Sequence, residues 1–397
     1  MTDATAGAES EALSDEMFGA IVREVRRFVR TEIVPLESTI DETDEIPERI
    51  RGQAAELGLF GFALPAEYGG IGLTVEQQVK LEFELGWTTP AFRSMFGTNN
   101  GIGGHVLVLG GTPEQRSALL PRLASGELTA AFALTEPDAG SSPADLTTTA
   151  RRDGDDWVLD GVKRYITNAP VADVFMVFAR TSQESRPADG ISAFVVPAGT
   201  AGLTVGPRDH KMGQFGAWTA DVILDGVRVR SDALIGADEG KGYRTALGCL
   251  AHGRLHIASL CVGLADRLVD ESLQRALHRR QGGRPIAEYQ LVEAMLADSQ
   301  TDLLAGRALV LEAARAYDAG TDRRLGPACA KLFCSEMVGR VADRAVQIHG
   351  GAGYMRGIPV ERFYRDARLF RIYEGTSQIQ QLVIAGEMIR AAQRAAR

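Results

Sequence analysis

Apolar residues recur at helical spacing throughout the first third of the chain. After Ser14, a suitable N-terminal cap, the apolar face of the first predicted helix comprises Met17, Ile21, Val25, Phe28 and Val29. Pro35 is predicted to end this helix, because proline cannot donate to the helical hydrogen-bond ladder. The same periodicity, interrupted by glycine-containing turns, continues to about Gly126. We therefore predict an all-helical N-terminal domain over residues 1–127.

The pattern changes to short β-rich runs between about Leu128 and Asp238. These runs include WVLDGVKRYIT, FMVFAR, ISAFVVP and TADVILDGVRV. Asp160-Gly161 and Asp225-Gly226 each stand between alternating apolar positions, which predicts a hairpin turn at both dipeptides. The sequence thus predicts a middle antiparallel β domain over residues 128–238.

Long helical segments return from Gly242 onward, and alanine and leucine dominate them. This composition is typical of helices that pack on other helices, as in a four-helix bundle. The third domain, over residues 239–397, is therefore predicted to be helical and four-helix-bundle-like. The whole chain is predicted to have an α+β fold in which a β domain lies between two helical domains.

Charge and composition exclude several classes of protein. The 397 residues include 43 lysines and arginines against 52 aspartates and glutamates, a net charge of −9, which argues against a nucleic-acid or anionic-membrane partner. No stretch of about 18 uninterrupted apolar residues is present, so no membrane span is predicted. The first residues, MTDATAGAESEALSDE, lack a secretory pattern and are expected to form a loose tail.

The four cysteines indicate a reducing compartment. Their spacings match neither CxxC nor a zinc ribbon, and they lie within helical segments. We therefore expect buried, reduced thiols and a cytoplasmic location. The residues concerned are Cys249, Cys261, Cys329 and Cys334.

Common nucleotide, metal and hydrolase motifs are missing from the sequence. It contains no GxGxxG, GxxxxGK[ST], HExxH or GxSxG pattern. His252 and His256 are spaced like two metal ligands on a helix, but no carboxylate or third ligand stands beside them. We therefore predict no metal site and interpret the pair as helix-surface or interface histidines.

One acidic residue near the C-terminus is a candidate catalytic base. In the segment RLFRIYEGTSQIQQLVIA, Glu374 follows bulky Ile372 and Tyr373 and precedes Gly375, which would let another molecule approach the backbone. A desolvated Glu374 would have a raised pKa and could remove a proton. The alternative is an acidic residue at a helix N-terminus with Thr376 or Ser377 as the cap. This segment alone leaves both interpretations open.

Several blocks of the sequence resemble the acyl-CoA dehydrogenase family of flavoenzymes. The blocks follow the family's order along nearly the whole chain: FALTEPDAGS, RYITNAP, KMGQFGAWTADVILDGVRV, GRLHIASLCVG, RRQGGRPIAEYQ, QIHGGAGY and IYEGTSQIQ. The resemblance implies the same order of helical, β and helical domains. It also implies FAD as the cofactor, acyl-CoA as the substrate and electron-transfer flavoprotein as the electron acceptor.

The family's chemistry gives specific expectations for this chain. Glu374 matches the family's base, which removes the α-proton while a β-hydride passes to flavin N5, giving a trans-2-enoyl-CoA. The family polarises the thioester carbonyl with the backbone N–H of this glutamate and a flavin ribityl hydroxyl. We expect a short- or medium-chain acyl thioester. Side chains such as Phe92, Met95, Phe96 and Asn99 are expected to set the pocket depth.

The resemblance also assigns flavin contacts to numbered residues. Within one subunit these are Phe132, Leu134, Thr135, Ser141, Tyr165, Ile166, Thr167, Thr376 and Gln378. A neighbouring subunit would supply Arg279, Gln290, Gln347, Gly350 and Gly351. Because the cofactor site then spans an interface, a homotetramer is implied.

Substrate contacts follow from the same resemblance. Ser141 and Arg254 match positions that touch the pantetheine and adenine end, and Gly375 matches the position against the thioester. Arg93-Ser94 resembles the stretch in which glutaryl-CoA dehydrogenases hold an arginine against the distal carboxylate. A dicarboxylyl thioester follows if Arg93 faces the pocket, whereas an outward surface arginine is the alternative. Carrier-protein-bound acyl groups and a catalytically silent, flavin-binding or scaffold protein are further alternatives.

Some positions depart from the family pattern. Gly253 stands where some relatives place an alternative base, which strengthens the prediction for Glu374. Gly282 replaces a phenylalanine that packs on the flavin, and Tyr165 replaces a tryptophan at the flavin edge. Gly282 fits neither a predicted turn nor a predicted cofactor approach.

Overall fold

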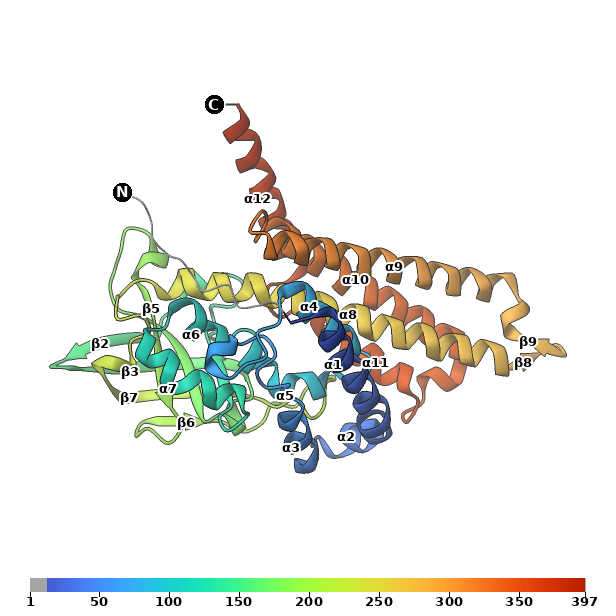
Figure 1. Cartoon of the computed structure of the whole chain (residues 1–397), viewed down its shortest axis with the longest axis horizontal. Helices are drawn as coiled ribbons and strands as arrows, with labels where there is room; N and C mark the ends of the chain where they lie inside the picture. Colours follow the sequence, from blue (N-terminus) through green and yellow to red (C-terminus); the bar gives the residue numbers. More distant parts are fainter. Residues whose placement is uncertain (1–12, 397) are drawn as a thin grey trace.

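A computed structural model of the chain describes residues 13–396 (Figure 1). It has helices at both ends of the chain and a sheet between them, as the sequence predicts. Residues 1–12 of the expected loose tail lie outside the described residues. The proposed domain boundaries after residues 127 and 238 remain a prediction; α7 ends at Ala124, β1 begins at Ala130, and α8 begins at Gly242.

The N-terminal part has seven α-helices, and the longest connection between them, from α3 to α4, contains a 3₁₀ turn at Ala66–Tyr68. Their bounds are α1 Asp15–Phe28, α2 Glu37–Thr43, α3 Glu48–Glu56, α4 Val75–Leu85, α5 Pro90–Asn100, α6 Gly104–Gly110 and α7 Pro113–Ala124. The Ser14 side chain accepts a hydrogen bond from Met17 N at 3.3 Å, which confirms the predicted cap.

Two details of the first predicted helix are wrong. Met17 is largely exposed, whereas Val25, Phe28 and Val29 are buried. Pro35 does not end the helical segment, because a π-turn and a 3₁₀ turn that contains Pro35 carry the chain directly into α2. Proline fits in the first turn of a helix, where its missing N–H would have no partner.

The middle part is a seven-stranded, mainly antiparallel sheet. Its strands are β1 Ala130–Ala133, β2 Thr149–Asp153, β3 Asp156–Thr167, β4 Val174–Arg180, β5 Ile191–Pro197, β6 Leu203–Val205 and β7 Thr219–Arg230. Their order is β1-β4-β2-β3-β7-β6, and β5 pairs with β4. β1 departs from the antiparallel prediction, since it lies parallel to β4, as β2 does over one residue pair.

The two Asp-Gly dipeptides are not hairpin turns, contrary to the prediction. Both lie inside the long paired strands β3 and β7, where Leu159 pairs with Val227 and Gly161 with Leu224. Two residues of β7 therefore oppose one residue of β3, which defines a β-bulge with Gly226 at φ 62°. Gly226 N donates to Asp160 Oδ1 at 2.7 Å, so the second dipeptide is paired with the first.

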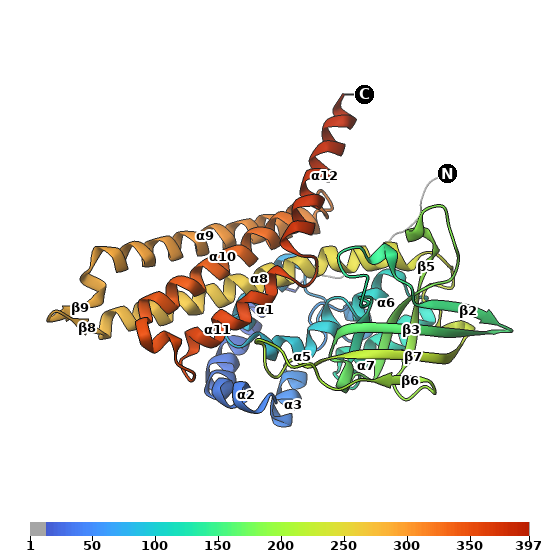
Figure 2. The same ribbon diagram turned by 180° about the vertical axis from the view of Figure 1, so that it is seen from behind.

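The C-terminal part is built from five helices, of which α8, α9 and α10 are long and lie side by side (Figure 2). They are α8 Gly242–His278, α9 Gln290–Asp318, α10 Leu325–His349, α11 Pro359–Ala367 and α12 Ser377–Ala395. The helix α12 projects away from the body of the protein. A small hairpin, β8 Arg280–Gln281 and β9 Arg284–Pro285, joins α8 to α9 at the end of the bundle farthest from the large sheet.

Gly282 has a conformational role in this hairpin. Gly282 and Gly283 form its two-residue turn with φ values of 55° and 82°. Two successive positive φ values are the signature of a type I′ turn, which favours glycine. Gly282 is therefore a turn glycine, although the sequence placed it in neither class.

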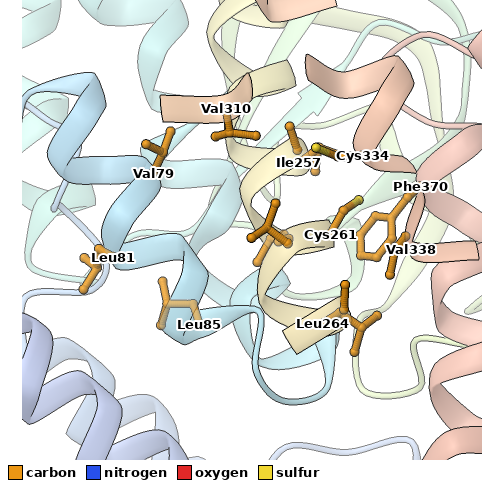
Figure 3. Packing of buried hydrophobic residues seen from close by; sticks show 14 of the residues in the cluster. Val79, Leu81, Leu85, Ile257, Cys261, Leu264, Val310, Cys334, Val338 and Phe370 are labelled. Atoms are coloured by element: carbon orange, nitrogen blue, oxygen red, sulfur yellow. The ribbon is translucent and has the colours of Figure 1, made fainter. Parts of the chain in front are cut away.

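The helix α8 is the centre of the core. Ile257, Cys261 and Leu264 of α8 pack between α4 on one side and α9 and α10 on the other (Figure 3). Among the described residues, α8 alone is long and apolar enough to cross a membrane, but 83% of its apolar window is buried inside the protein. Its composition is that of a core helix. The four cysteines are free thiols; Cys249, Cys261 and Cys334 are buried, and Cys329 is partly buried.

Candidate functional site

A cavity of about 390 Å³ lies where the three parts of the chain meet. Its walls come from α5, the loop after β1, the end of β3, α8 and the segment before α12. Eleven of the residues predicted from the sequence line it: Arg93, Phe132, Leu134, Thr135, Ser141, Tyr165, Ile166, Thr167, Arg254, Glu374 and Gly375. Residues separated by more than 200 positions therefore share one cavity.

The candidate base lies in a turn just before α12. Glu374 and Gly375 have φ values of 52° and 90°, so this turn is left-handed. Lys331 Nζ of α10 donates to Gly375 O at 2.6 Å, and Gln380 Nε2 donates to the carbonyls of Glu374 and Gly375 at 3.2 and 3.0 Å. These bonds hold a residue type that rarely adopts positive φ, a conformation that is concentrated at functional sites.

The Glu374 carboxylate is left without a partner. Its Oε2 atom is shielded from solvent and accepts no hydrogen bond from the described residues. Burial raises the pKa of Glu374, and the cationic side chains of Arg93, Lys331 and Arg254 partly offset this rise. A carboxylate with a raised pKa and a free oxygen has the properties of a general base.

Gly253 provides the space that this carboxylate occupies. A Cβ atom at position 253 would lie 3.1 Å from Glu374 Cδ and closer still to Oε2. Any side chain on α8 at this position would therefore displace the carboxylate. The family departure noted at Gly253 is thus a steric requirement of Glu374.

The wall formed by the ends of β1 and β3 contains the residues predicted to hold a flavin. Phe132 is the second-last residue of β1, and Leu134 and Thr135 follow the strand. Tyr165, Ile166 and Thr167 end β3, and Tyr165 has a φ of 58° and is largely exposed.

A buried ion pair supports this wall from behind. Lys163 Nζ donates to Glu136 Oε1 at 2.8 Å and to Leu134 O at 3.3 Å. Thr147 N and Thr148 N also donate to the Glu136 carboxylate. Burial alone would raise the pKa of Glu136, but Lys163 and these donors lower it to about 2.

The remaining predicted cofactor residues lie elsewhere. Arg279, Gln290, Gln347, Gly350 and Gly351 are exposed at the far end of the bundle, where Arg275 Nη2 donates to His349 O at 3.4 Å. They do not reach the cavity of their own chain.

Thr376 and Gln378 are not among the residues that line the cavity. Thr376 is the N-cap of α12, because its side chain accepts a hydrogen bond from Ile379 N at 3.2 Å. Glu374 lies two residues before this cap, outside the helix. Gln378 is exposed on the first turn of α12.

Arg93 points inward. Its side chain is 9% exposed, lines the cavity and pairs through Nε with Glu82 Oε1 at 3.0 Å. The alternative of an outward surface arginine is therefore wrong. Phe92 and Phe96 belong to the apolar core instead, with ring centroids 5.2 Å apart, so they do not set the depth of the cavity.

Two other expected depth-setting residues also lie away from the cavity. Asn99 binds the backbone of Leu123 and Leu128. Met95 lines a separate surface pocket.

Arg254 differs from its expected place. It is buried on α8, its Nε atom has no hydrogen-bond partner among the described residues, and it is close enough to Glu374 to lower the pKa of the carboxyl. This location is beside the candidate base. The adenine end of a bound thioester would lie farther out.

Sequence reasoning missed several residues of the site. Gln214 lines the cavity with a φ of 53°, and its backbone N donates to Asp366 Oδ1. Lys331 was missed as well, and no local signal marks either residue.

His252 and His256 are wrongly predicted as surface or interface residues. Both are buried, and each Nε2 lies 2.8 Å from Gln78 Oε1. Among residues 13–396, no group of three or more potential ligands could hold a metal ion.

Comparison with known proteins identifies the family. Models of the acyl-CoA dehydrogenase N-terminal, middle and C-terminal domains match residues 16–127, 131–227 and 240–389. The chain belongs to the acyl-CoA dehydrogenase family. It is therefore an oxidoreductase that acts on CH–CH bonds and uses FAD.

Three similar proteins illustrate the range of the family. The chain is 38% identical to 3-(aryl)acrylate reductase of Clostridium sporogenes, over 93% of this chain and 98% of the relative. It is 38% identical to the caffeyl-CoA reductase-Etf complex subunit CarC of Acetobacterium woodii, over 88% and 92%. The structure of butyryl-CoA dehydrogenase from Megasphaera elsdenii matches with a TM-score of 0.91 and 30% identity, covering 95% of this chain and 99% of that one.

The chemistry of the cavity wall fits a flavin. Phe132 and Tyr165 offer aromatic surface, Thr135, Ser141 and Thr167 offer hydroxyl groups, and Gly140 has open space beside its Cα. An isoalloxazine ring has a flat apolar body with a polar edge, which these groups match.

Proposed function

We propose that this protein dehydrogenates a short- or medium-chain acyl-CoA to the trans-2-enoyl-CoA, with Glu374 as the base that removes the α-proton. The observation that carries the proposal is the Glu374 side chain, which lines the cavity and whose Oε2 atom is shielded from solvent and has no hydrogen-bond partner among the described residues. A raised pKa makes this carboxylate a stronger base than an exposed glutamate.

The same turn would also bind the thioester carbonyl. The α-proton of an acyl thioester is weakly acidic, so negative charge on the carbonyl oxygen must be stabilised as the proton leaves. The backbone N–H of Glu374 is our candidate donor, since Lys331 and Gln380 already fix the carbonyl groups of this turn. Gly375 then lies against the thioester, and FAD, when bound, accepts the β-hydride.

We assign the flavin to the wall formed by the ends of β1 and β3. Phe132, Leu134, Thr135, Ser141, Tyr165, Ile166 and Thr167 would hold it, with Thr376 and Gln378 nearby. The exposed group at the far end of the bundle, Arg279, Gln290, Gln347, Gly350 and Gly351, would serve a flavin of a neighbouring subunit. This arrangement requires an oligomer, and we propose a homotetramer.

An electron-transfer flavoprotein is the proposed electron acceptor. A relative 38% identical to this chain is a subunit of a reductase-Etf complex. The exposed Tyr165 lies at the cavity wall proposed to hold the flavin edge, where an acceptor would approach.

Replacement of the base tests the proposal. Glu374→Gln removes the proton acceptor with little change in shape, so we expect a yellow, FAD-loaded protein whose flavin is not bleached by butyryl-CoA or octanoyl-CoA under anaerobic conditions. Full bleaching of this variant at the wild-type rate would contradict the assignment. Equal FAD content, measured by absorbance, is the control for folding.

A second candidate substrate is a dicarboxylyl-CoA. Arg93 lines the cavity, and a distal carboxylate of the substrate could pair with its guanidinium. If so, glutaryl-CoA should be turned over faster than butyryl-CoA, and Arg93→Ala should reverse this order. If butyryl-CoA is the faster substrate of both proteins, the first candidate stands.

A further inference from the structure

A chain of buried hydrogen bonds joins Arg93 to helices α4 and α8. Arg93 Nη2 lies 2.9 Å from His256 Nδ1, and since a guanidinium only donates, Nδ1 is the acceptor. His256 Nε2 therefore carries the proton and donates to Gln78 Oε1 at 2.8 Å. The orientation of the Gln78 amide agrees, because its Nε2 donates to Leu73 O at 2.7 Å.

Every member of this chain is shielded from water. Gln78, Glu82 and His256 are 4%, 0% and 0% exposed. Burial holds the pKa of His256 well below its ordinary value, with further effects of His252 and Arg93, so the ring is neutral. A neutral ring with a fixed tautomer is a permanent acceptor for the Arg93 guanidinium.

A glycine on α5 leaves room for the guanidinium. A Cβ atom at Gly97 would overlap Arg93 Nη1 and lie 2.7 Å from Cζ. At Gly101, a Cβ atom would lie 3.9 Å from Arg93 Nη2 and 4.0 Å from His256 Nδ1. The distances at Gly101 are ordinary van der Waals contacts, so it is the missing side chain at Gly97 that lets the guanidinium fold back along α5 toward α8.

The consequence concerns Glu374. Arg93 and Glu374 line the same cavity and interact electrostatically, yet no hydrogen bond joins them, and Glu374 Oε2 has no partner among the described residues. Two of the five guanidinium N–H donors, one on Nε and one on Nη2, are instead bound to Glu82 and His256, and these two bonds fix the orientation of the guanidinium. We propose that His256 and Glu82 are positioning residues that hold the Arg93 guanidinium away from Glu374, so that the carboxylate keeps a free oxygen for proton removal.

The proposal concerns the position of Arg93 alone and not that of the other titratable groups around Glu374. The titratable groups that interact with it are Glu82, Arg93, Cys249, Arg254, Lys331 and Tyr373. Lys211 lines the same cavity but donates to Ala217 O at 2.7 Å. Among Arg93, Arg254, Lys331 and Lys211, only Arg93 is hydrogen-bonded to a histidine among the described residues. The inference rests on the proposed function, because it assumes that Glu374 is the base.

The test replaces the acceptor without changing any charge. His256→Leu frees the Arg93 Nη2 donor, and we expect the guanidinium to pair with Glu374. The acidic limb of the kcat against pH profile should then move by one unit or more to lower pH, and the plateau should fall at least tenfold. His256→Asn keeps an acceptor oxygen near the Nδ1 position and should restore the plateau to within threefold of wild type.

A matched control and a second variant guard against folding effects. His105 stacks on His252 with ring centroids 4.4 Å apart and does not touch Arg93, so His105→Leu should leave the pH profile unchanged. Gly97→Ala displaces the guanidinium without altering the histidines and should move the acidic limb in the same direction as His256→Leu. FAD content and thermal unfolding are measured for each variant.

Wild-type pH profiles in both His256→Leu and Gly97→Ala would overturn the inference. Failure of the proposed function would give a different result, because the flavins of wild type and Glu374→Gln would then be bleached to the same extent by every thioester. Failure of the inference alone leaves an active, Glu374-dependent enzyme whose pH profile does not respond to position 256.

Discussion

Substitution of Gly253 by alanine should inactivate the enzyme without unfolding it. The added methyl group would lie well inside 3.0 Å of Glu374 Oε2, whereas ordinary contact begins at 3.4 Å. The carboxylate must therefore move by about 1 Å, and a displacement of this size at a reacting group costs on the order of 10²-fold in rate. Folding should be spared because Oε2 is the end of a flexible side chain.

The assay compares kcat for butyryl-CoA with an artificial electron acceptor, and FAD content from absorbance. Gly52→Ala is the matched control, because Gly52 lies in the interior of α3 and a Cβ atom there would meet nothing within 4 Å. Alanine in place of a helical glycine should stabilise both variants by up to about 1 kcal/mol. A Gly253→Ala enzyme with kcat within threefold of wild type would refute the steric argument and weaken the assignment of Glu374.

Three further predictions concern the supports of the site. Lys163→Met leaves Glu136 buried without its cation and should lower the free energy of unfolding by about 3 kcal/mol, measured by urea denaturation. A decrease below 0.5 kcal/mol would contradict it. The stability that Glu136 contributes should be present above pH 4.5 and lost as the pH falls toward 2, so Glu136→Gln should flatten acid unfolding in that range. Lys331→Met removes the hydrogen bond to Gly375 O and so loosens the turn that holds Glu374. We expect a larger change in kcat than in KM, and an unchanged kcat would refute this.

The order of the domains was predictable because helical and strand periodicities are local. Ser14 caps α1 as expected, and α8 to α10 follow the alanine- and leucine-rich segments. The Asp-Gly dipeptides failed for a physical reason. Positive φ at Gly226 serves a bulge as well as it serves a hairpin, and only the partner strand, more than 60 residues away, distinguishes them.

Only those residues of the candidate site that belong to recognisable sequence motifs could be predicted from the sequence. The residues of the blocks around Phe132, Tyr165 and Glu374 meet in one cavity as expected. Whether Arg93 points inward depends on Glu82 of α4 and His256 of α8, and thus on packing between three helices. A side-chain direction of this kind cannot be derived from spacing along one helix.

The surroundings of Glu374 carry two opposing demands. The thioester enolate of the proposed reaction would need positive charge nearby, which Arg93, Arg254 and Lys331 would supply. A base needs an oxygen that no cation has bound, because an ion pair lowers the pKa of a carboxylate and weakens it as a base. Two of these cations have hydrogen-bond partners other than Glu374: Lys331 binds Gly375 O, and Arg93 binds Glu82 and His256. Positive charge therefore acts on Glu374 at a distance, while its Oε2 atom remains unpaired.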